Sequence, residues 1–258
     1  MPKKSVNRDD YQHVSNPFSA MANEFPSGHV IAEHSHYRAQ LLFAEQGIME
    51  TYARQRCWFI PPQRALWLPS YEPHSMRTHG RVALRTIFID PAACRDDSPN
   101  SPQAVRISPL LRELLVRSAL IAIDYDKEGR DGLIMNLINE EIDWSEPDLF
   151  SLSWPMDERL LHVCQHLKTY PDDCRTLEEW GSEIGVSNRT LSRLFRLETG
   201  ISFSEWRQQS RILAALPMLL SGMSVLEASL AVGYETPSAF SAMFRRLIGK
   251  APREFLQS

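Results

Sequence analysis

The feature that most constrains this chain is a duplicated pattern in its C-terminal third. The segments TLEEWGSEIGVSNRTLSRLF (176–195) and SVLEASLAVGYETPSAFSAMF (224–244) carry the same plan about 48 residues apart. Each has a capped short helix, a glycine and a second capped helix. Two short helices joined this tightly must cross steeply, which is the helix-turn-helix arrangement. The repeat predicts two such units, at about 177–198 and 225–248.

Local signals support both units. Gly185 and Gly233 fall at the two turns, where a positive φ is expected, and Ser187 and Thr236 precede the second helix of each unit as N-caps. The apolar set of the first unit has helical spacing and predicts a shared core: Leu177, Trp180, Ile184, Leu191, Leu194 and Phe195. Further helix starts are marked by capping boxes: Thr176 to Glu179, Ser202 to Glu205, and Ser224 to Glu227.

Between the units, SEWRQQSRILAALPMLLSG predicts a connecting helix of roughly 17 residues, or ~26 Å. Pro217 is expected to end or kink it near its last turn. Successive major-groove faces on one side of B-DNA are ~34 Å apart, so a helix of this order could place two recognition helices in adjacent grooves. The charge agrees: the chain carries −4 overall, but residues 187–258 hold 9 basic and 5 acidic side chains.

The N-terminal part has a different pattern. From about Phe25 to Ile89 it consists of short β segments separated by turn signals, which predicts a small antiparallel barrel. The polar stretch 95–103 predicts a linker, and two helical stripes follow it. Stripes of this kind form a core or a dimer contact. The first stripe consists of Leu110, Leu111, Leu114, Leu115 and Ala119, and the second of Leu133, Ile134, Leu137, Ile138 and Glu141.

Two histidines one residue apart, His34 and His36, raise the question of a metal centre. If both lie in one strand, they project to the same face. A divalent metal needs at least three protein ligands, and His74 is the candidate for the third. Histidines in a soluble protein are more often surface or core residues than ligands. The motif therefore leaves metal binding and ordinary packing open.

At this point the residues show a family resemblance. The segment 176–256, above all GYETPSAFSAMFRRLIGKAPREF, closely resembles the DNA-binding domain of AraC/XylS-type transcription regulators, and the N-terminal part resembles the cupin sensor domain that many members carry. The resemblance implies an α+β chain of three parts: a cupin-like sensor domain (1–94), a linker with helices for dimerisation (95–156) and the DNA-binding domain (157–258). It also implies a ligand-controlled, sequence-specific regulator of neighbouring transport or detoxification genes, acting as activator or repressor.

The cupin-like motif runs through Gly28, His34, His36, Gln40, Gly47, Pro69 and His74. It departs from the family pattern at Gln40, where a glutamate is usual, at Tyr71, where a glycine is usual, and at Thr78, where an asparagine is usual. Losing the carboxylate removes a charge that would offset a divalent cation. His34, His36, Gln40 and His74 are therefore expected to line a sensor pocket that requires no cofactor, with a metal on the three histidines as the alternative.

The resemblance places base contacts on the second helix of each unit. In the first, Arg189, Ser192 and Arg193 lie opposite the core face, and an arginine can bridge O6 and N7 of guanine. In the second, the outward residues are small, which favours reading thymine methyls, shape or backbone; Arg245 and Arg246 are expected to hold phosphates. The expected DNA-binding set is Ser187, Asn188, Arg189, Ser192, Arg193, Pro237, Ser238, Ser241, Ala242, Arg245 and Arg246.

The expected partners are double-stranded DNA, an unknown small-molecule effector, a second copy of the chain and RNA polymerase. The sequence has neither a membrane span nor a secretory signal, which favours the cytoplasm. The competing hypothesis is a metal-dependent cupin enzyme, a dioxygenase or isomerase with an accessory helical domain. Gln40 argues against it, and no Ser-His-Asp, Cys-His or phosphate-loop motif supplies another chemistry.

Overall fold

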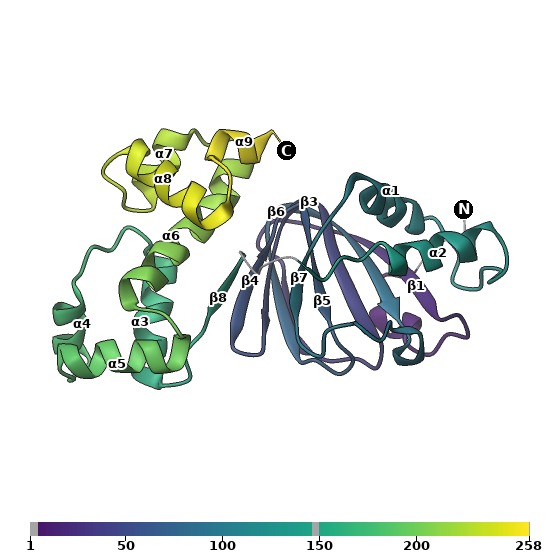
Figure 1. Ribbon diagram of the computed structural model, residues 1–258, viewed down its shortest axis with the longest axis horizontal. Helices are drawn as coiled ribbons and strands as arrows, with labels where there is room; N and C mark the ends of the chain where they lie inside the picture. The colour runs from purple at the N-terminus through teal and green to yellow at the C-terminus, as the bar shows by residue number, and fades with distance from the viewer. Residues whose placement is uncertain (1–4, 146–149, 258) are drawn as a thin grey trace. The chain divides into compact units, whose positions relative to one another are not determined.

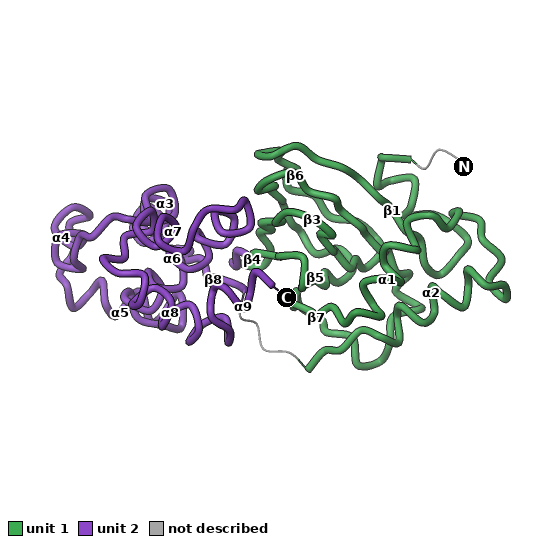
Figure 2. Tube along the Cα trace, turned by 90° about the horizontal axis from the view of Figure 1, so that it is seen from above, with its two compact units in different colours: residues 1–54, 58–148 green, residues 55–57, 149–258 purple. Residues whose placement is uncertain are grey.

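The computed structural model describes residues 5–145 and 150–257. The chain separates into two compact units, residues 1–54 with 58–148 and residues 55–57 with 149–258 (Figure 2). None of the helices in the described part of the chain is long and apolar enough to span a membrane.

The first unit is built on an antiparallel sheet. Its strands are β1 (Phe18–Phe25), β2 (Val30–His34), β3 (Ala39–Ala53), β4 (Arg56–Ile60), β5 (Arg64–Leu68), β6 (His74–Ile89) and β7 (Gln103–Arg106), and it also contains the 3-10 helices η1 (Arg8–Tyr11) and η2 (Pro91–Ala93). The long strand β6 pairs with β1, β2 and β3, while β5 pairs with β3 and β7. The sheet thus begins earlier than the expected start near Phe25, because Phe18–Phe25 pairs fully with β6.

The long strand β3 is interrupted by a register shift around Gly47. Gly47 has φ 76°, and a Cβ on this residue would lie 2.5 Å from the Arg81 carbonyl oxygen. Only glycine fits such a close approach between strands. The irregularity lets β3 change direction while both of its halves stay paired with β6.

Two helices, α1 (Pro109–Ser118) and α2 (Arg130–Glu140), pack on the sheet (Figure 1). Leu111 and Leu115 from α1 and Met135 from α2 share one hydrophobic core with Phe43 and Trp67 of the sheet. Of the segment 95–156, expected to connect the two domains, residues 95–145 therefore belong to the first unit.

The polar stretch 95–103 is also anchored to this unit rather than free. Arg95 donates to the carbonyls of Asn139 and Ile142, and the Trp67 indole donates to the Pro99 carbonyl at 2.8 Å. The stretch was predicted to be a linker because it contains no apolar residues. Its contacts with the first unit are hydrogen bonds, which an apolar pattern does not indicate.

Within its described residues, the second unit is helical apart from β8 (Ser151–Ser153) and the first two residues of β4. Its helices are α3 (Glu158–Thr169), α4 (Leu177–Glu183), α5 (Asn188–Thr199), α6 (Phe203–Leu220), α7 (Val225–Ala231), α8 (Pro237–Ile248) and α9 (Pro252–Leu256) (Figure 1). Residues 55–57 group with it, and the Trp154 N–H donates to the Gln55 carbonyl at 2.7 Å.

The predicted pair of helix-turn-helix units is confirmed as α4–α5 and α7–α8, with α6 between them. The three capping boxes are formed, Ser187 and Thr236 cap α5 and α8, and Gly185 and Gly233 have φ of 71° and 78°. Pro217 lies at the start of the last turn of α6, which ends at Leu220. The side chains that are fully buried in these units include Trp180, Leu191, Phe195, Ala228, Phe240 and Phe244.

Candidate nucleic-acid interface and sensor pocket

The first recognition helix, α5, is held by its partner α4. Gly181 of α4 lies so close to the turn that a Cβ there would be 2.7 Å from the Val186 carbonyl oxygen. Leu191 and Phe195 bury the inner face of α5 completely. The Ser187 hydroxyl accepts the Thr190 N–H at 3.2 Å and fixes the N-terminus. The helix is thereby a rigid platform for its outer face.

The outer face of α5 presents two arginines. Arg189 and Arg193 are exposed and lie one turn apart, with half-buried Ser192 between them. Within residues 150–257, neither guanidinium has an ion pair or a hydrogen bond. A guanidinium that no protein group holds keeps all five N–H donors for an external acceptor. Both side chains are thus available to contact DNA bases, as the sequence predicts.

The outer face of α8 is different. Ser238 and Ala242 are exposed, and Pro237 and Ser241 are half-buried. Arg245 donates to Glu254 at 3.2 Å, and Arg246 donates to the side-chain oxygen of Gln208 at 2.9 Å. The small residues offer few directional contacts, while both cations near the end of the helix already have partners within the unit.

Helix α6 carries a connection that the sequence did not reveal. Arg211 is half-buried and donates to three backbone carbonyls, those of Pro171, Asp173 and Gly233, at 2.8 to 2.9 Å. The first two precede α4, and the third is the turn of the second helix-turn-helix. One side chain therefore ties the segment before α4 and the turn of the second helix-turn-helix to the connecting helix. An arginine within a helical pattern gives no signal of such long-range contacts.

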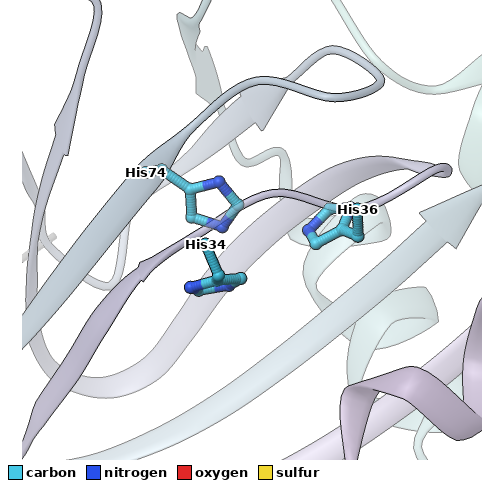
Figure 3. A group of neighbouring side chains, drawn as sticks. All are labelled: His34, His36 and His74. Atoms are coloured by element: carbon cyan, nitrogen blue, oxygen red, sulfur yellow. The ribbon is translucent and has the colours of Figure 1, made fainter.

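The second candidate site lies in the first unit, where His34, His36 and His74 come together (Figure 3). One nitrogen from each imidazole lies within 4.8 Å of the others. His34 ends β2 and His74 begins β6, but His36 lies beyond β2. The two histidines therefore do not share one strand, but their rings still lie on a common side in the cluster.

Each histidine is oriented by a backbone carbonyl. The Nδ1 atoms of His34, His36 and His74 lie 2.8, 2.7 and 2.8 Å from the carbonyl oxygens of Ala32, Arg38 and Glu72. Burial lowers the pKa of His34 and of His36, and it lowers the pKa of His74 to about 3. All three rings are accordingly neutral near pH 7.

The loop before β6 positions two of these histidines. The Tyr71 N–H donates to the His36 carbonyl at 2.8 Å, and the Glu72 carbonyl accepts from His74. Tyr71 has φ 60°, a left-handed conformation that glycine adopts most readily. This is the position where the cupin pattern has glycine. The tyrosine keeps the glycine conformation at the cost of backbone strain, on the order of 1–2 kcal/mol.

A cavity of about 760 Å³ adjoins the histidine cluster. Both His34 and Gln40 line it, together with apolar side chains and residues of the N-terminal segment, among them Arg8, Met21, Phe25 and Met76. The volume is in the range of small-molecule sites, and an apolar wall with a few polar groups is typical of them. Of the four residues expected to line a pocket, His34 and Gln40 line this cavity, whereas His36 and His74 do not.

Both units resemble domains of known protein families. Residues 22–138 match the model of the AraC-like ligand binding domain, and residues 180–258 match a helix-turn-helix domain. The HTH-type transcriptional regulator NimR of Escherichia coli (strain K12) is 28% identical over 86% of this chain and 81% of its own length.

A second relative is the thermoregulatory protein LcrF of Yersinia pestis, which is 33% identical over 83% of this chain and 78% of its own length. Among solved structures, ToxT from Vibrio cholerae O395 aligns over 93% of this chain and 97% of its own at 13% identity, with a TM-score of 0.40. The named relatives are transcription regulators, and neither domain match is to an enzyme. With its ligand-binding sheet domain followed by two helix-turn-helix units, this chain belongs to the AraC family of DNA-binding transcription regulators.

Proposed function

We propose that this regulator responds to a small molecule bound in the cavity beside His34 and Gln40, and that it controls transport or detoxification genes adjacent to its own. The cavity is supported by its volume and by its mixture of apolar and polar lining. A regulator of this kind acts where the chromosome is, in the cytoplasm. RNA polymerase is its further partner at promoters that it activates.

The observation that carries the DNA-binding part is the pair of unpartnered arginines on α5. Arg189 and Arg193 are exposed at the N-terminal half of a recognition helix, where side chains reach base edges. In this proposal each bridges O6 and N7 of a guanine, worth ~1–3 kcal/mol of discrimination per contact. The second unit adds shape, thymine-methyl and backbone contacts through α8.

The proposed regulator acts as a homodimer through α1 and α2. Leu110, Leu133 and Leu137 leave 49%, 66% and 41% of their surface exposed. They belong to the stripes whose inner members, including Leu111 and Ile138, form the core. Leucines at such exposure favour a second partner surface. Light scattering should give twice the mass of the chain, and L133E with L137E should reduce it to one chain; a monomeric wild type, on and off DNA, would refute the dimer.

The proposed function is tested by fluorescence anisotropy with DNA from upstream of the gene and its neighbour, in competition with random DNA at several salt concentrations. Tight, salt-dependent binding that survives the competitor is expected. Equal, weak binding to both DNAs would contradict sequence-specific regulation. The same assay tests the effector. A substrate of the neighbouring gene product should change the affinity of the protein for the specific DNA.

A further inference from the structure

We propose that Arg81, Arg85 and Arg112 form a binding site for a phosphate group, either inorganic phosphate or a phosphate ester, in a surface hollow between the sheet and α1. The hollow has a volume of about 680 Å³ and is also lined by Glu24 and Glu45. Of the described residues that line this hollow or the cavity of the proposed effector, the two share only Glu24. The inference therefore goes beyond the proposed function, and it is tested without DNA or that effector.

The strand pattern places two of the arginines on the face of the sheet that carries α1 and α2. Side chains two residues apart in a strand point to the same face. In β6, Arg81 and Arg85 are in phase with Ile87, which belongs to the core that the sheet shares with the two helices. Ile87 is fully buried, whereas the Arg81 side chain is 73% exposed. This face is thus covered at its apolar end and open at its charged end, where the hollow lies.

Arg112 approaches the hollow from the helix. Its guanidinium carbon lies 5.8 Å from the centre of the Phe43 ring, and Phe43 pairs with Arg85 across β3 and β6. Cross-strand partners lie side by side on one face of a sheet. The attraction between a cation and an aromatic ring holds Arg112 against the sheet. Arg112 and Arg85 are therefore neighbours, although they come from different elements.

Two carboxylates fix the orientation of Arg85. Its Nη2 lies 2.7 Å from an oxygen of Glu45, and its Nη1 donates to the Leu84 carbonyl at 3.1 Å and to Glu24 at 3.4 Å. The Arg85 side chain is only 16% exposed, so these contacts hold its guanidinium in place. The three guanidinium groups that line the hollow outnumber its two carboxylates, so the hollow attracts anions.

Arg81 and Arg112 supply the donors for a ligand. An oxygen of Glu24 lies 3.7 Å from Nε of Arg81, and an oxygen of Glu113 lies 4.0 Å from Nε of Arg112. Both distances are too long for a hydrogen bond. In the described part of the chain, neither guanidinium makes a hydrogen bond. Each therefore keeps its five N–H donors for an external acceptor.

This arrangement favours a phosphate group over a carboxylate. An arginine binds an oxyanion through two parallel N–H donors, so two arginines need up to four acceptor positions. A carboxylate has two oxygens, whereas the phosphate of a monoester has three strongly accepting oxygens and a larger negative charge near pH 7. One phosphate group can accept from Arg81 and Arg112 together, beside the fixed charge of Arg85. The bound group would bridge β6 and α1, the helix that presents Leu110 in the proposed dimer.

The test is a calorimetric titration of the full-length protein with inorganic phosphate and with glycerol 3-phosphate, at constant ionic strength set with sodium chloride. One phosphate per chain is expected. R112Q should weaken binding at least about tenfold, because it removes hydrogen bonds to a charged ligand. R117Q is the matched control: Arg117 also lies on α1, and its side chain is 38% exposed against 39% for Arg112, but it does not line the hollow. It should bind phosphate like the wild type.

A second pair of variants tests the sheet side of the site. R81Q should also weaken binding at least about tenfold. R77Q removes an exposed charge from the same strand outside the hollow, so it should leave binding unchanged. R112K should bind more tightly than R112Q and less tightly than the wild type, because lysine keeps the charge but lacks the paired donors. Helical circular dichroism checks that each variant is folded.

The outcomes separate the possible ligands. Tighter binding of glycerol 3-phosphate identifies a phosphorylated metabolite as the occupant, and tighter binding of inorganic phosphate identifies the free ion. Absence of saturable binding, or equal binding by R112Q and R117Q, would overturn the site. Acetate that binds as tightly as phosphate would overturn the ligand class.

Discussion

The two helix-turn-helix units share one plan but leave different side chains free. Counted from the first residue of each recognition helix, Arg189 and Arg193 of α5 correspond to Ser238 and Ala242 of α8. The first unit thus presents two unpartnered guanidinium groups where the second presents a hydroxyl and a methyl. Duplication preserved the buried positions, which set the fold, while the exposed positions were free to diverge. Sequence readout is therefore expected to be concentrated in the first unit.

The turns of the two units differ as well. A Cβ on Gly185 would meet nothing within 4 Å, whereas a Cβ on Gly233 would lie 2.7 Å from the Asp172 Cα and 2.9 Å from the Arg211 guanidinium. The first turn faces open space, and the second is packed against α6 and the segment before α4. The turn of the second unit is therefore more tightly enclosed than the turn of the first.

The largest effect should come from comparing these turn glycines. G233A combines backbone strain with a clash against backbone, and should lower the free energy of unfolding by about 2–4 kcal/mol. G185A has only the strain, about 1 kcal/mol. Chemical denaturation followed by helical circular dichroism measures both. Equal losses would mean that the second turn is not packed more tightly than the first.

The next largest effect concerns base readout. R193A should reduce discrimination between specific and random DNA by ~1–3 kcal/mol, with little loss on random DNA. S238A, at the position of the second unit that corresponds to Arg189, should change discrimination much less. Competition anisotropy on the two DNAs measures both variants. A larger loss in S238A would move the main readout to the second unit.

A smaller and more uniform effect is expected for R246A. If Arg246 leaves Gln208 to hold a phosphate, the R246A substitution should weaken specific and random binding alike. It should also lower the slope of log K against log salt concentration by about 1 in magnitude. The variant Q208A removes only the partner seen in the structure, so it should leave the slope unchanged. A loss of discrimination in R246A would instead make this arginine a base contact.

The sequence predicted most of the second unit because its signals are local. Caps, turn glycines and helical apolar spacing act over three to seven residues, and the structure confirms Ser187, Gly185 and the capping boxes. What it could not predict depends on distant groups. Arg211 reaches three carbonyls from other segments, and nothing near it in the sequence announces them.

The first unit illustrates the same limit. The three histidines meet, but His36 lies beyond the end of β2, where its carbonyl accepts the Tyr71 N–H, and the strand pattern gave no sign of this contact. The helices after residue 103 join the sheet core because Leu111 and Leu115 pack against it. An amphipathic stripe shows that a helix has a buried face but does not say which surface covers it. The DNA contacts themselves remain predictions.

The smallest expected effect concerns the capping glutamates of α4 and α7, whose pKa values are lowered by different donors. The pKa of Glu179 is lowered chiefly by the Thr176 N–H, at 2.6 Å from its carboxylate, and the pKa of Glu227 chiefly by the Ser224 hydroxyl, at 2.6 Å. Because each pKa is lowered on folding, both caps stabilise their helices above the ordinary pKa near 4.5 and lose this contribution as the pH falls through the folded value.

Removing the hydroxyls should therefore have unequal consequences. S224A deletes the main cause of the shift in the second unit, so the pKa of Glu227 should rise toward its ordinary value. T176A keeps the backbone donor, so the pKa of Glu179 should rise less. Carboxyl carbon chemical shifts followed by NMR between pH values above and below 4.5 measure both. If the two pKa values rise equally, backbone and hydroxyl donors contribute alike, and the two caps are equivalent despite their different residues.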